Sequence, residues 1–371
     1  MKTLKKIINI FIFFTIAFIV LNILLGYFWS LRTKYKFNNY KPYSDEVLQV
    51  LNLNEKESLI LYLETWQTDR MYEYEQFTGL VESPRKDFSY VNFSKINGRK
   101  IKNGDVCNIS FFFYGGETTF GYNVTDEQTF ASFFKDILNI KFPNKNYCVF
   151  NFGRGNYFST QENILFQQHI LKKKFKPGDF VFFIDGANED GNKDILNTKF
   201  LEYIYIVFHQ KYWDLYRHTL PMFLSTLPVV QLSKKVKKNF NLQKINKNKN
   251  FQKQILIKNE NGEEMLQVLQ DNISIRNSVC EKFILNCYTF LQPFAGVHGI
   301  YSENYPNDLI EIQNKKYLIL KKTKNIIDIS SSLNNDKELS YVDNTNYSPP
   351  ANKSIAKYIY QIIEKKIETA N

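Results

Sequence analysis

The pattern of apolar and polar positions separates an apolar N-terminal stretch from a long region in which short apolar runs alternate with amphipathic segments. Residues 7–29, IINIFIFFTIAFIVLNILLGYFW, are almost wholly apolar and are long enough to cross a bilayer as a helix. Basic residues flank this stretch on both sides, and no small-residue cleavage site follows it. We therefore predict an uncleaved signal anchor of a single-pass membrane protein, with a short cytoplasmic tip and an extracytoplasmic globular part.

The remaining apolar runs predict strands and the amphipathic segments between them predict helices. Each of the first three strands ends in a turn rich in Gly and Asn, which is typical of repeated βα units and a parallel sheet. The expected strands are Val106–Tyr114, Tyr147–Phe152, Phe180–Ile184 and Cys287–Leu291, and the expected helices are Thr125–Phe142, Thr160–Phe175, Glu263–Asn286 and Asn352–Ile367. We expect Asp308–Ile329 to be helical or irregular.

Residues 200–261 interrupt this alternation. An aromatic stretch is followed by Lys234–Lys253, which is rich in Lys and Asn, and we interpret the whole segment as an inserted lid or membrane-facing excursion. The net charge of +11 suits an anionic membrane surface or an acidic glycan, and nucleic acid is the usual alternative. Because the excess lies largely in this one segment, it is not a nucleic-acid footprint, and we expect no nucleic-acid partner.

The four cysteines show neither metal-ligand spacing nor a Cys-x-x-Cys pair. Cys280 and Cys287 are seven residues apart in a helical pattern, and on a straight helix they would lie roughly 10 Å apart, too far to bridge. Cys107 and Cys148 lie in or beside predicted strands, where both a disulfide and buried free thiols remain open. Free cysteine is commonly buried, so we expect free thiols.

Ser110–Gly121, SFFFYGGETTFG, has the order of a buried strand, a Gly-Gly turn and a helix start. In an open α/β sheet such a turn lies at the carboxyl end of a strand, where ligands bind. The side chain after Gly116 is presented there, and it is Glu117, a carboxylate instead of a nucleophilic hydroxyl. We expect the helix N-terminus to lower the pKa of Glu117.

Four motifs occur in a recognisable order along the chain, and together they are specific where each alone is weak. They are GGETTFG at 115–121, NFGRGNYFSTQE at 151–162, DGANE at 185–189 and YVDNTNYSPPANKSIA at 341–356. The order resembles that of the SGNH/GDSL hydrolase family, in the branch whose first motif reads GGSTTFG. The flanking YEYEQFTGL, NGR and FLQP are also similar to that branch.

The resemblance implies a three-layer α/β/α sandwich with a parallel sheet, of SGNH/flavodoxin-like type. We divide the chain into residues 1–36 with the anchor, a leading segment 37–104, and an SGNH-hydrolase-like domain 105–371 with the insert at about 200–261. In the family a serine attacks an ester, a histidine accepts the proton and an aspartate orients the histidine. Backbone N–H groups and an asparagine side chain hold the oxyanion.

By position, the resemblance places the triad at Glu117, Asp343 and Asn346, so that only the aspartate is kept. The oxyanion groups fall at Gly116, Asn156 and Asn188, of which the asparagine at 188 matches. Asn346 has no titratable group to act as a base. This departure from the family pattern predicts that ordinary serine-ester chemistry is lost, because loss of either triad member removes most of the rate.

Three further interpretations of these residues remain open. Of the four histidines, His298 is best placed to act as a substitute base. Glu117 itself can act as a general base on water, with Asn188 polarising the carbonyl. Alternatively, Glu117 caps its helix and forms an ion pair with Arg154. We expect no metal and no cofactor at this site.

The predicted function is that of a membrane-anchored, degenerate SGNH/GDSL-like protein of the cell envelope that binds an acylated or carbohydrate ligand. The alternative is an active esterase or O-acyltransferase that acts on ester bonds of envelope glycans or lipids with displaced catalytic groups. In both cases the expected partners are an acyl ester, lipid or glycan ligand and, through the N-terminal helix, the membrane.

Overall fold

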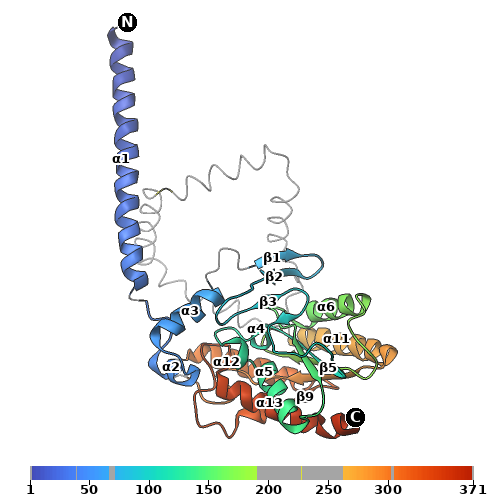
Figure 1. Ribbon diagram of the computed structural model, residues 1–371. Coiled ribbons are helices and arrows are strands. Elements are labelled where there is room, and N and C mark those ends of the chain that lie inside the picture. Colours follow the sequence, from blue (N-terminus) through green and yellow to red (C-terminus); the bar gives the residue numbers. More distant parts are fainter. Residues whose placement is uncertain are drawn as a thin grey trace. The chain divides into compact units, whose positions relative to one another are not determined.

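The computed structural model describes residues 2–38, 40–66, 72–189, 227, 262–301 and 305–369 (Figure 1). The chain divides into two compact units, residues 1–40 with 192–260 and residues 41–191 with 261–371, and each is treated separately. Only Leu227 of the predicted insert is described, so the expectation of a lid lies outside the described residues.

The described part of the first unit is dominated by helix α1 (Lys2–Asn38). Within it, Ile8–Tyr27 has a mean hydropathy of 2.7 and buries none of its surface inside the structure. This helix is long and apolar enough to cross a membrane, although an N-terminal signal sequence satisfies the same criteria.

The second unit is built on a seven-stranded sheet with the order β3-β4-β6-β5-β7-β8-β9. The strands are β3 (Phe93–Ser94), β4 (Gly98–Arg99), β5 (Ile109–Gly115), β6 (Tyr147–Asn151), β7 (Phe180–Asp185), β8 (Asn286–Leu291) and β9 (Ile327–Asp328). The last five are parallel to one another, and their order along the sheet is the flavodoxin-like 2-1-3-4-5. A short antiparallel hairpin, β3–β4, extends one edge.

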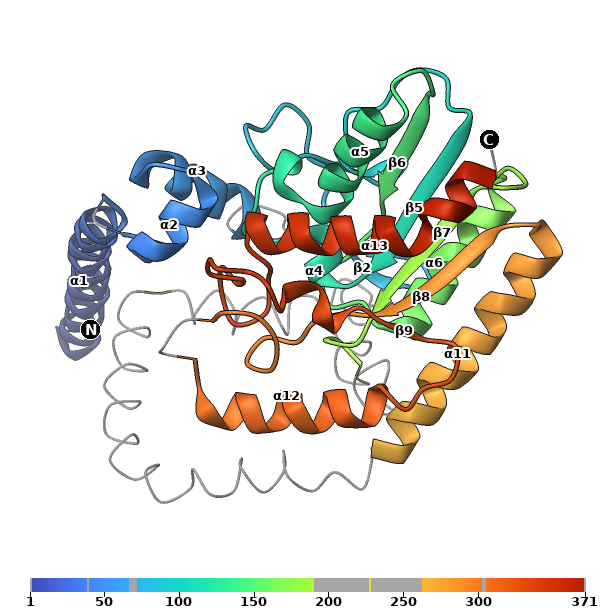
Figure 2. The same cartoon turned by 90° about the horizontal axis from the view of Figure 1, so that it is seen from below.

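Helices cover both faces of this sheet, as Figure 2 shows. Because side chains alternate along β5, Phe111 and Phe113 lie in one core cluster while Phe112 and Tyr114 lie in another. The first cluster includes α5 (Phe130–Lys141) and α13 (Pro349–Thr369), and the second includes α6 (Ser159–Leu171) and α11 (Gly262–Phe283). The predicted three-layer α/β/α sandwich with a parallel sheet is therefore confirmed.

Smaller elements complete the unit. Helices α2 (Asp45–Leu51) and α3 (Glu55–Trp66) share a core cluster with Phe120 of the first motif and with Tyr122 and Val124, which follow it, so residues 41–66 pack beside this motif. Strands β1 (Tyr72–Glu75) and β2 (Gly79–Glu82) form a separate antiparallel pair. The remaining elements are α4 (Glu117–Phe120), α12 (Asn307–Leu320) and the 3₁₀ turns Asp126–Gln128 and Ser330–Leu333.

The structure overturns the expectation of free thiols. Cys107 pairs with Cys148 and Cys280 pairs with Cys287, so all four cysteines form disulfides. The helix that carries Cys280 ends at Phe283, and Ile284 adopts a left-handed φ of +57°. The chain therefore reverses into β8 and brings the Cα atoms of Cys280 and Cys287 to 6.1 Å, whereas the prediction assumed one straight helix.

Candidate functional site

Glu117 begins the single-turn helix α4 directly after β5, as the order of strand, turn and helix predicts. Gly116, the residue before it, is packed against the third motif. A Cβ at this glycine would lie 2.0 Å from Asn188 Nδ2 and 3.0 Å from the carbonyl oxygen of Tyr157. Only glycine leaves room for Asn188, so the first and third motifs meet at the start of α4.

The Glu117 carboxyl group has its pKa raised to about 7, because burial disfavours the charged form and because the charge of Asp343 acts on it. The expectation that the helix would lower this pKa was therefore wrong. Helix α4 contains only four residues, so its dipole is small beside the cost of removing a carboxylate from water. Near neutral pH, Glu117 is present in both protonation states.

Asp343 lies close enough to Glu117 to affect its ionisation and accepts four hydrogen bonds. The donors are Asn123 Nδ2 at 2.6 Å, the backbone N–H groups of Thr345 and Asn346 at 2.8 and 2.7 Å, and Asn346 Nδ2 at 2.9 Å. Asn346 is 3% exposed, and its Oδ1 atom has no hydrogen-bond partner among the described residues. The fourth motif thus supplies an ionisable acceptor and a buried amide.

The second motif places Asn156 at the surface with a φ of +60°, in the left-handed region that glycine favours and asparagine tolerates. The second motif donates hydrogen bonds to two backbone carbonyl groups of the first motif. Arg154 N donates to the carbonyl of Gly115 at 3.0 Å, and Asn151 Nδ2 donates to the carbonyl of Thr119 at 2.7 Å. The strand ends that carry Glu117 and Asn156 are therefore joined.

Arg154 does not form the alternative ion pair with Glu117 in the described part of the chain. Its guanidinium group is fully buried and lies 4.4 Å from the ring centroid of Phe93. Helix α4 is preceded by Gly116, whose residue type offers no capping side chain. Glu117 is the first helical residue, so its carboxyl group does not act as the N-cap.

A buried ionic cluster supports the third motif, and no sequence pattern indicated this cluster. Arg276 of α11 pairs with Asp185 at the end of β7 and, at 3.3 Å, with Glu162 of α6. Glu189 accepts hydrogen bonds from the N–H and hydroxyl groups of Ser159 at 2.8 and 2.9 Å. These contacts hold both ends of the turn that presents Asn188.

Two further side-chain amides, those of Asn188 and Gln292, lie beside the first and second motifs. Asn188 Nδ2 donates to the carbonyl of Tyr157 at 3.0 Å. Gln292, in the FLQP segment after β8, accepts a hydrogen bond from Thr118 Oγ1 at 2.6 Å. The fourth parallel strand therefore also ends beside α4, a role that we did not assign to this glutamine from the sequence.

His298 lies among residues of other elements. Its Nδ1 atom accepts a hydrogen bond from the N–H of Phe294 at 3.1 Å, and its ring centroid lies 4.5 Å from that of Tyr317 on α12. Burial lowers its pKa, and the charge that favours protonation is that of Asp328. No described interaction joins His298 to Glu117 or Asp343.

His169 is buried in α6, where Nδ1 lies 2.6 Å from the Tyr114 hydroxyl. Burial and nearby Lys and Arg residues lower its pKa to about 2. His209 and His218 lie outside the described residues. Within those described, no group of three or more His, Cys, Asp or Glu side chains is arranged to hold a metal ion.

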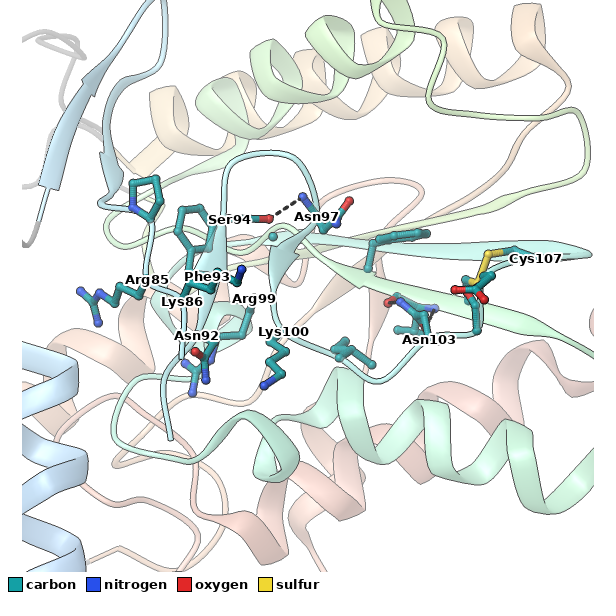
Figure 3. Close-up of a pocket in the computed structure, with 18 of the residues that line it drawn as sticks. Arg85, Lys86, Asn92, Phe93, Ser94, Asn97, Arg99, Lys100, Asn103 and Cys107 are labelled. Atoms are coloured by element: carbon teal, nitrogen blue, oxygen red, sulfur yellow. Dashed lines mark hydrogen bonds between the residues drawn. A yellow bond between two sulfur atoms is a disulfide. The ribbon is translucent and has the colours of Figure 1, made fainter. Parts of the chain in front are cut away.

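A separate cavity of about 840 Å³ follows the β3–β4 hairpin and the edge of β6 (Figure 3). Ser94 and Asn97 lie on one side of it, where Asn97 N donates to Ser94 Oγ at 3.0 Å, and Cys107 lies at its far end. None of the four candidate residues Glu117, Asn188, Asp343 and Asn346 lines this cavity.

The strand order is flavodoxin-like, the first three motifs follow β5, β6 and β7, and the fourth lies in the loop before α13, an arrangement of SGNH/GDSL-hydrolase-like type. No protein-family model and no curated protein matches the sequence. Three similar solved structures are the esterase EstA from Pseudoalteromonas, a lipolytic G-D-S-L family protein from Veillonella parvula and an acetylxylan esterase from Geobacillus stearothermophilus.

These three structures are 10%, 10% and 11% identical to this chain, with TM-scores of 0.35, 0.36 and 0.37. The matches cover 70%, 69% and 69% of this chain and 100%, 99% and 94% of the respective structures. Identities and scores of this size assign no activity to this chain.

Proposed function

We propose that this protein is a membrane-anchored, SGNH-like envelope protein that binds a neutral acylated or carbohydrate ligand and has lost serine-ester chemistry. The proposal is carried by the pair Glu117 and Asn346, which by the resemblance of the sequence motifs stand at the positions of nucleophile and base, and by the charge of Asp343, which acts on Glu117. A carboxyl group has no hydroxyl that a neighbouring base can convert into the alkoxide of an acyl-enzyme. An amide cannot take up the proton.

The same groups are well suited to bind uncharged polar groups. Near pH 7 the protonated form of Glu117 can donate to an ester carbonyl, and the ionised form can accept from a sugar hydroxyl. Asn156 and Asn188 add amide groups at neighbouring strand ends. Among the described residues, the candidate side chains Glu117, Asn156 and Asn188 are mixed donors and acceptors and none is a cation, which favours a neutral acylated glycan over a phosphate or carboxylate ligand.

Two observations support an extracytoplasmic location. Helix α1 is long and apolar enough to anchor the chain. Both cysteine pairs are oxidised, and structural disulfides persist mainly outside reducing compartments. We therefore place the second unit on the extracytoplasmic side of the membrane.

A second candidate function is hydrolysis of an ester with Glu117 as general base, and the pKa of this residue favours it. A base is most effective when its pKa lies near the working pH, and about 7 meets that condition. In this mechanism Glu117 removes a proton from water while Asn188 donates to the developing oxyanion. No covalent intermediate forms.

The two functions are separated by assaying the full chain in detergent. We expect an acetylated oligosaccharide to bind more tightly than its deacetylated form in calorimetry, with negligible hydrolysis of p-nitrophenyl acetate. Asn188→Ala should weaken binding at least tenfold, whereas Asn97→Ala, at the separate cavity, should leave it unchanged. Hydrolysis that Glu117→Ala abolishes would establish the general-base enzyme instead, and absence of binding would refute the ligand assignment.

A further inference from the structure

Asn123, two residues after the first motif, joins three distant parts of the second unit. Its Oδ1 atom accepts hydrogen bonds from the Tyr43 hydroxyl at 2.8 Å and from Trp66 Nε1 at 2.6 Å. Its Nδ2 atom donates to Oδ2 of Asp343 at 2.6 Å. Tyr43 precedes α2 and Trp66 ends α3, so the segment that follows the N-terminal helix is connected through one side chain to the candidate site.

The orientation of this amide is determined by its two donors. Two hydrogen bonds occupy both lone pairs of Oδ1, so Nδ2 must point the other way, toward Asp343. Asn123 is 4% exposed and has a left-handed φ of +62°, which limits its own alternatives. If either partner withdraws, this buried amide is left with an unsatisfied polar atom, which is unfavourable away from water.

Among the described hydrogen-bond donors to Asp343, Asn123 is the one that lies outside the loop of Asp343 itself. The remaining donors, on Thr345 and Asn346, lie within three residues of Asp343 and move with it. The rings around Asn123 are closely packed, with Trp66 against Tyr122 at a centroid distance of 5.0 Å. Residues 41–66 therefore limit where the Asp343 carboxylate can lie.

We propose that Tyr43, Trp66 and Asn123 are positioning residues through which the segment 41–66 orients Asp343 and regulates ligand binding at Glu117. The regulatory part rests on the proposed function, whereas the positioning part does not. Displacement of α2 and α3 frees Asn123 Oδ1, lets the amide rotate and removes one donor from Asp343. By thermodynamic reciprocity, a ligand that favours the oriented Asp343 also stabilises the packing of α2 and α3.

The titration midpoint of Glu117 measures this coupling in the absence of a ligand. The negative charge of Asp343 raises the pKa of Glu117, and it also raises the pKa of the Tyr305 phenol. When Asp343 loses the Asn123 donor, its negative charge is less compensated, and protonated Glu117 becomes more stable. The titration midpoint of Glu117 should therefore rise.

The test uses the full chain in lipid nanodiscs, with infrared absorption of the protonated carboxyl group as the readout. Subtraction of the Glu117→Gln spectrum assigns the band. We expect Tyr43→Phe combined with Trp66→Phe, and separately Asn123→Ala, to raise the midpoint by about 0.5 pH units, a threefold change in proton affinity. Tyr43→Phe removes only the donor hydroxyl, whereas Trp66→Phe removes the donor and part of the indole ring that packs on Tyr122.

Thr65→Val is the matched control, because it removes a buried hydroxyl of α3 that donates to the Leu61 carbonyl and makes no described hydrogen bond to Asn123. It should leave the midpoint unchanged. A midpoint that is also unchanged, or lower, in folded Tyr43→Phe/Trp66→Phe and Asn123→Ala proteins overturns the proposal. Failure of every glycan to bind would refute the proposed function and leave this titration result intact.

Discussion

Asn346 donates its side-chain amide to Oδ2 of Asp343 at 2.9 Å, three residues before it in the chain. In the Asp-x-x-His motif that the sequence resembles, an imidazole N–H makes the corresponding contact. The amide thus preserves the hydrogen bond to the aspartate but offers no second nitrogen that can take up a proton.

Replacement of Glu117 by serine and Asn346 by histidine should create esterase activity, because the introduced imidazole can donate to Asp343 as the amide does. We expect Glu117→Ser/Asn346→His to hydrolyse p-nitrophenyl acetate at least tenfold faster than the wild type, and each single variant to remain near the wild-type rate. Addition of Asn188→Ala should lower the new activity by about 100-fold. A folded double variant without any gain would count against a hydrolase-derived pocket.

Glu117→Gln should stabilise the protein above neutral pH. Since the pKa of Glu117 is about 7 when folded and near 4.5 when unfolded, the folded state binds the proton more tightly. This group therefore reduces the free energy of unfolding as the pH rises from 4.5 to 7, by up to about 3 kcal/mol. Glutamine does not ionise, so the variant does not undergo this loss. In urea unfolding it should be more stable than the wild type at pH 8 but not at pH 4.5. The exposed Glu127→Gln serves as control.

Asp343→Asn should lower the pKa of Glu117, because it removes the like charge and leaves only burial to raise that pKa. The infrared titration of the carboxyl group measures the change. Thr345 and Asn346 can still donate their backbone N–H groups to the new side-chain oxygen, whereas the side-chain amides of Asn123 and Asn346 lose their acceptor, so circular dichroism is used to verify that the variant is folded. An unchanged midpoint would mean that Asp343 does not influence Glu117.

Arg276→Met should destabilise the protein by about 3–5 kcal/mol, because it leaves the buried carboxylates of Asp185 and Glu162 without their cation. Denaturant unfolding at pH 7 measures the loss. Lys282→Met, at an exposed position of the same helix, should change stability by less than about 0.5 kcal/mol. Equal stability of the two variants would contradict the role given to the cluster.

The two disulfides should contribute unequally to stability. In the loop-entropy model, the bridge between Cys107 and Cys148 spans 41 residues and should contribute about 4 kcal/mol, and that between Cys280 and Cys287 spans seven and should contribute about 2 kcal/mol. Paired Cys→Ser variants measured by denaturant unfolding test this order. The reverse order would show that local strain, not loop closure, decides the contributions.

The predicted strands agree with the observed strands to within about three residues. Phe180–Ile184 was expected and Phe180–Asp185 is observed, because an uninterrupted apolar run buried on both faces is readable from sequence. Strand β9 was missed, since Ile327–Asp328 contains only two residues. The bend at Ile284 was also missed, and with it the disulfide between Cys280 and Cys287.

The sequence by itself determined the apolar helix, the βα alternation, the turns that carry Glu117, Asn156 and Asn188 after successive strands, and the loop that carries Asp343, because each depends on local periodicity or on an ordered motif. Only the tertiary structure decided the pKa of Glu117, the burial of Arg276 and the link from Tyr43 and Trp66 through Asn123 to Asp343. The physical reason is the sequence separation of the residues that make these contacts. Burial and hydrogen bonds between residues as far apart as 220 positions arise when distant segments pack together, and no local pattern encodes them.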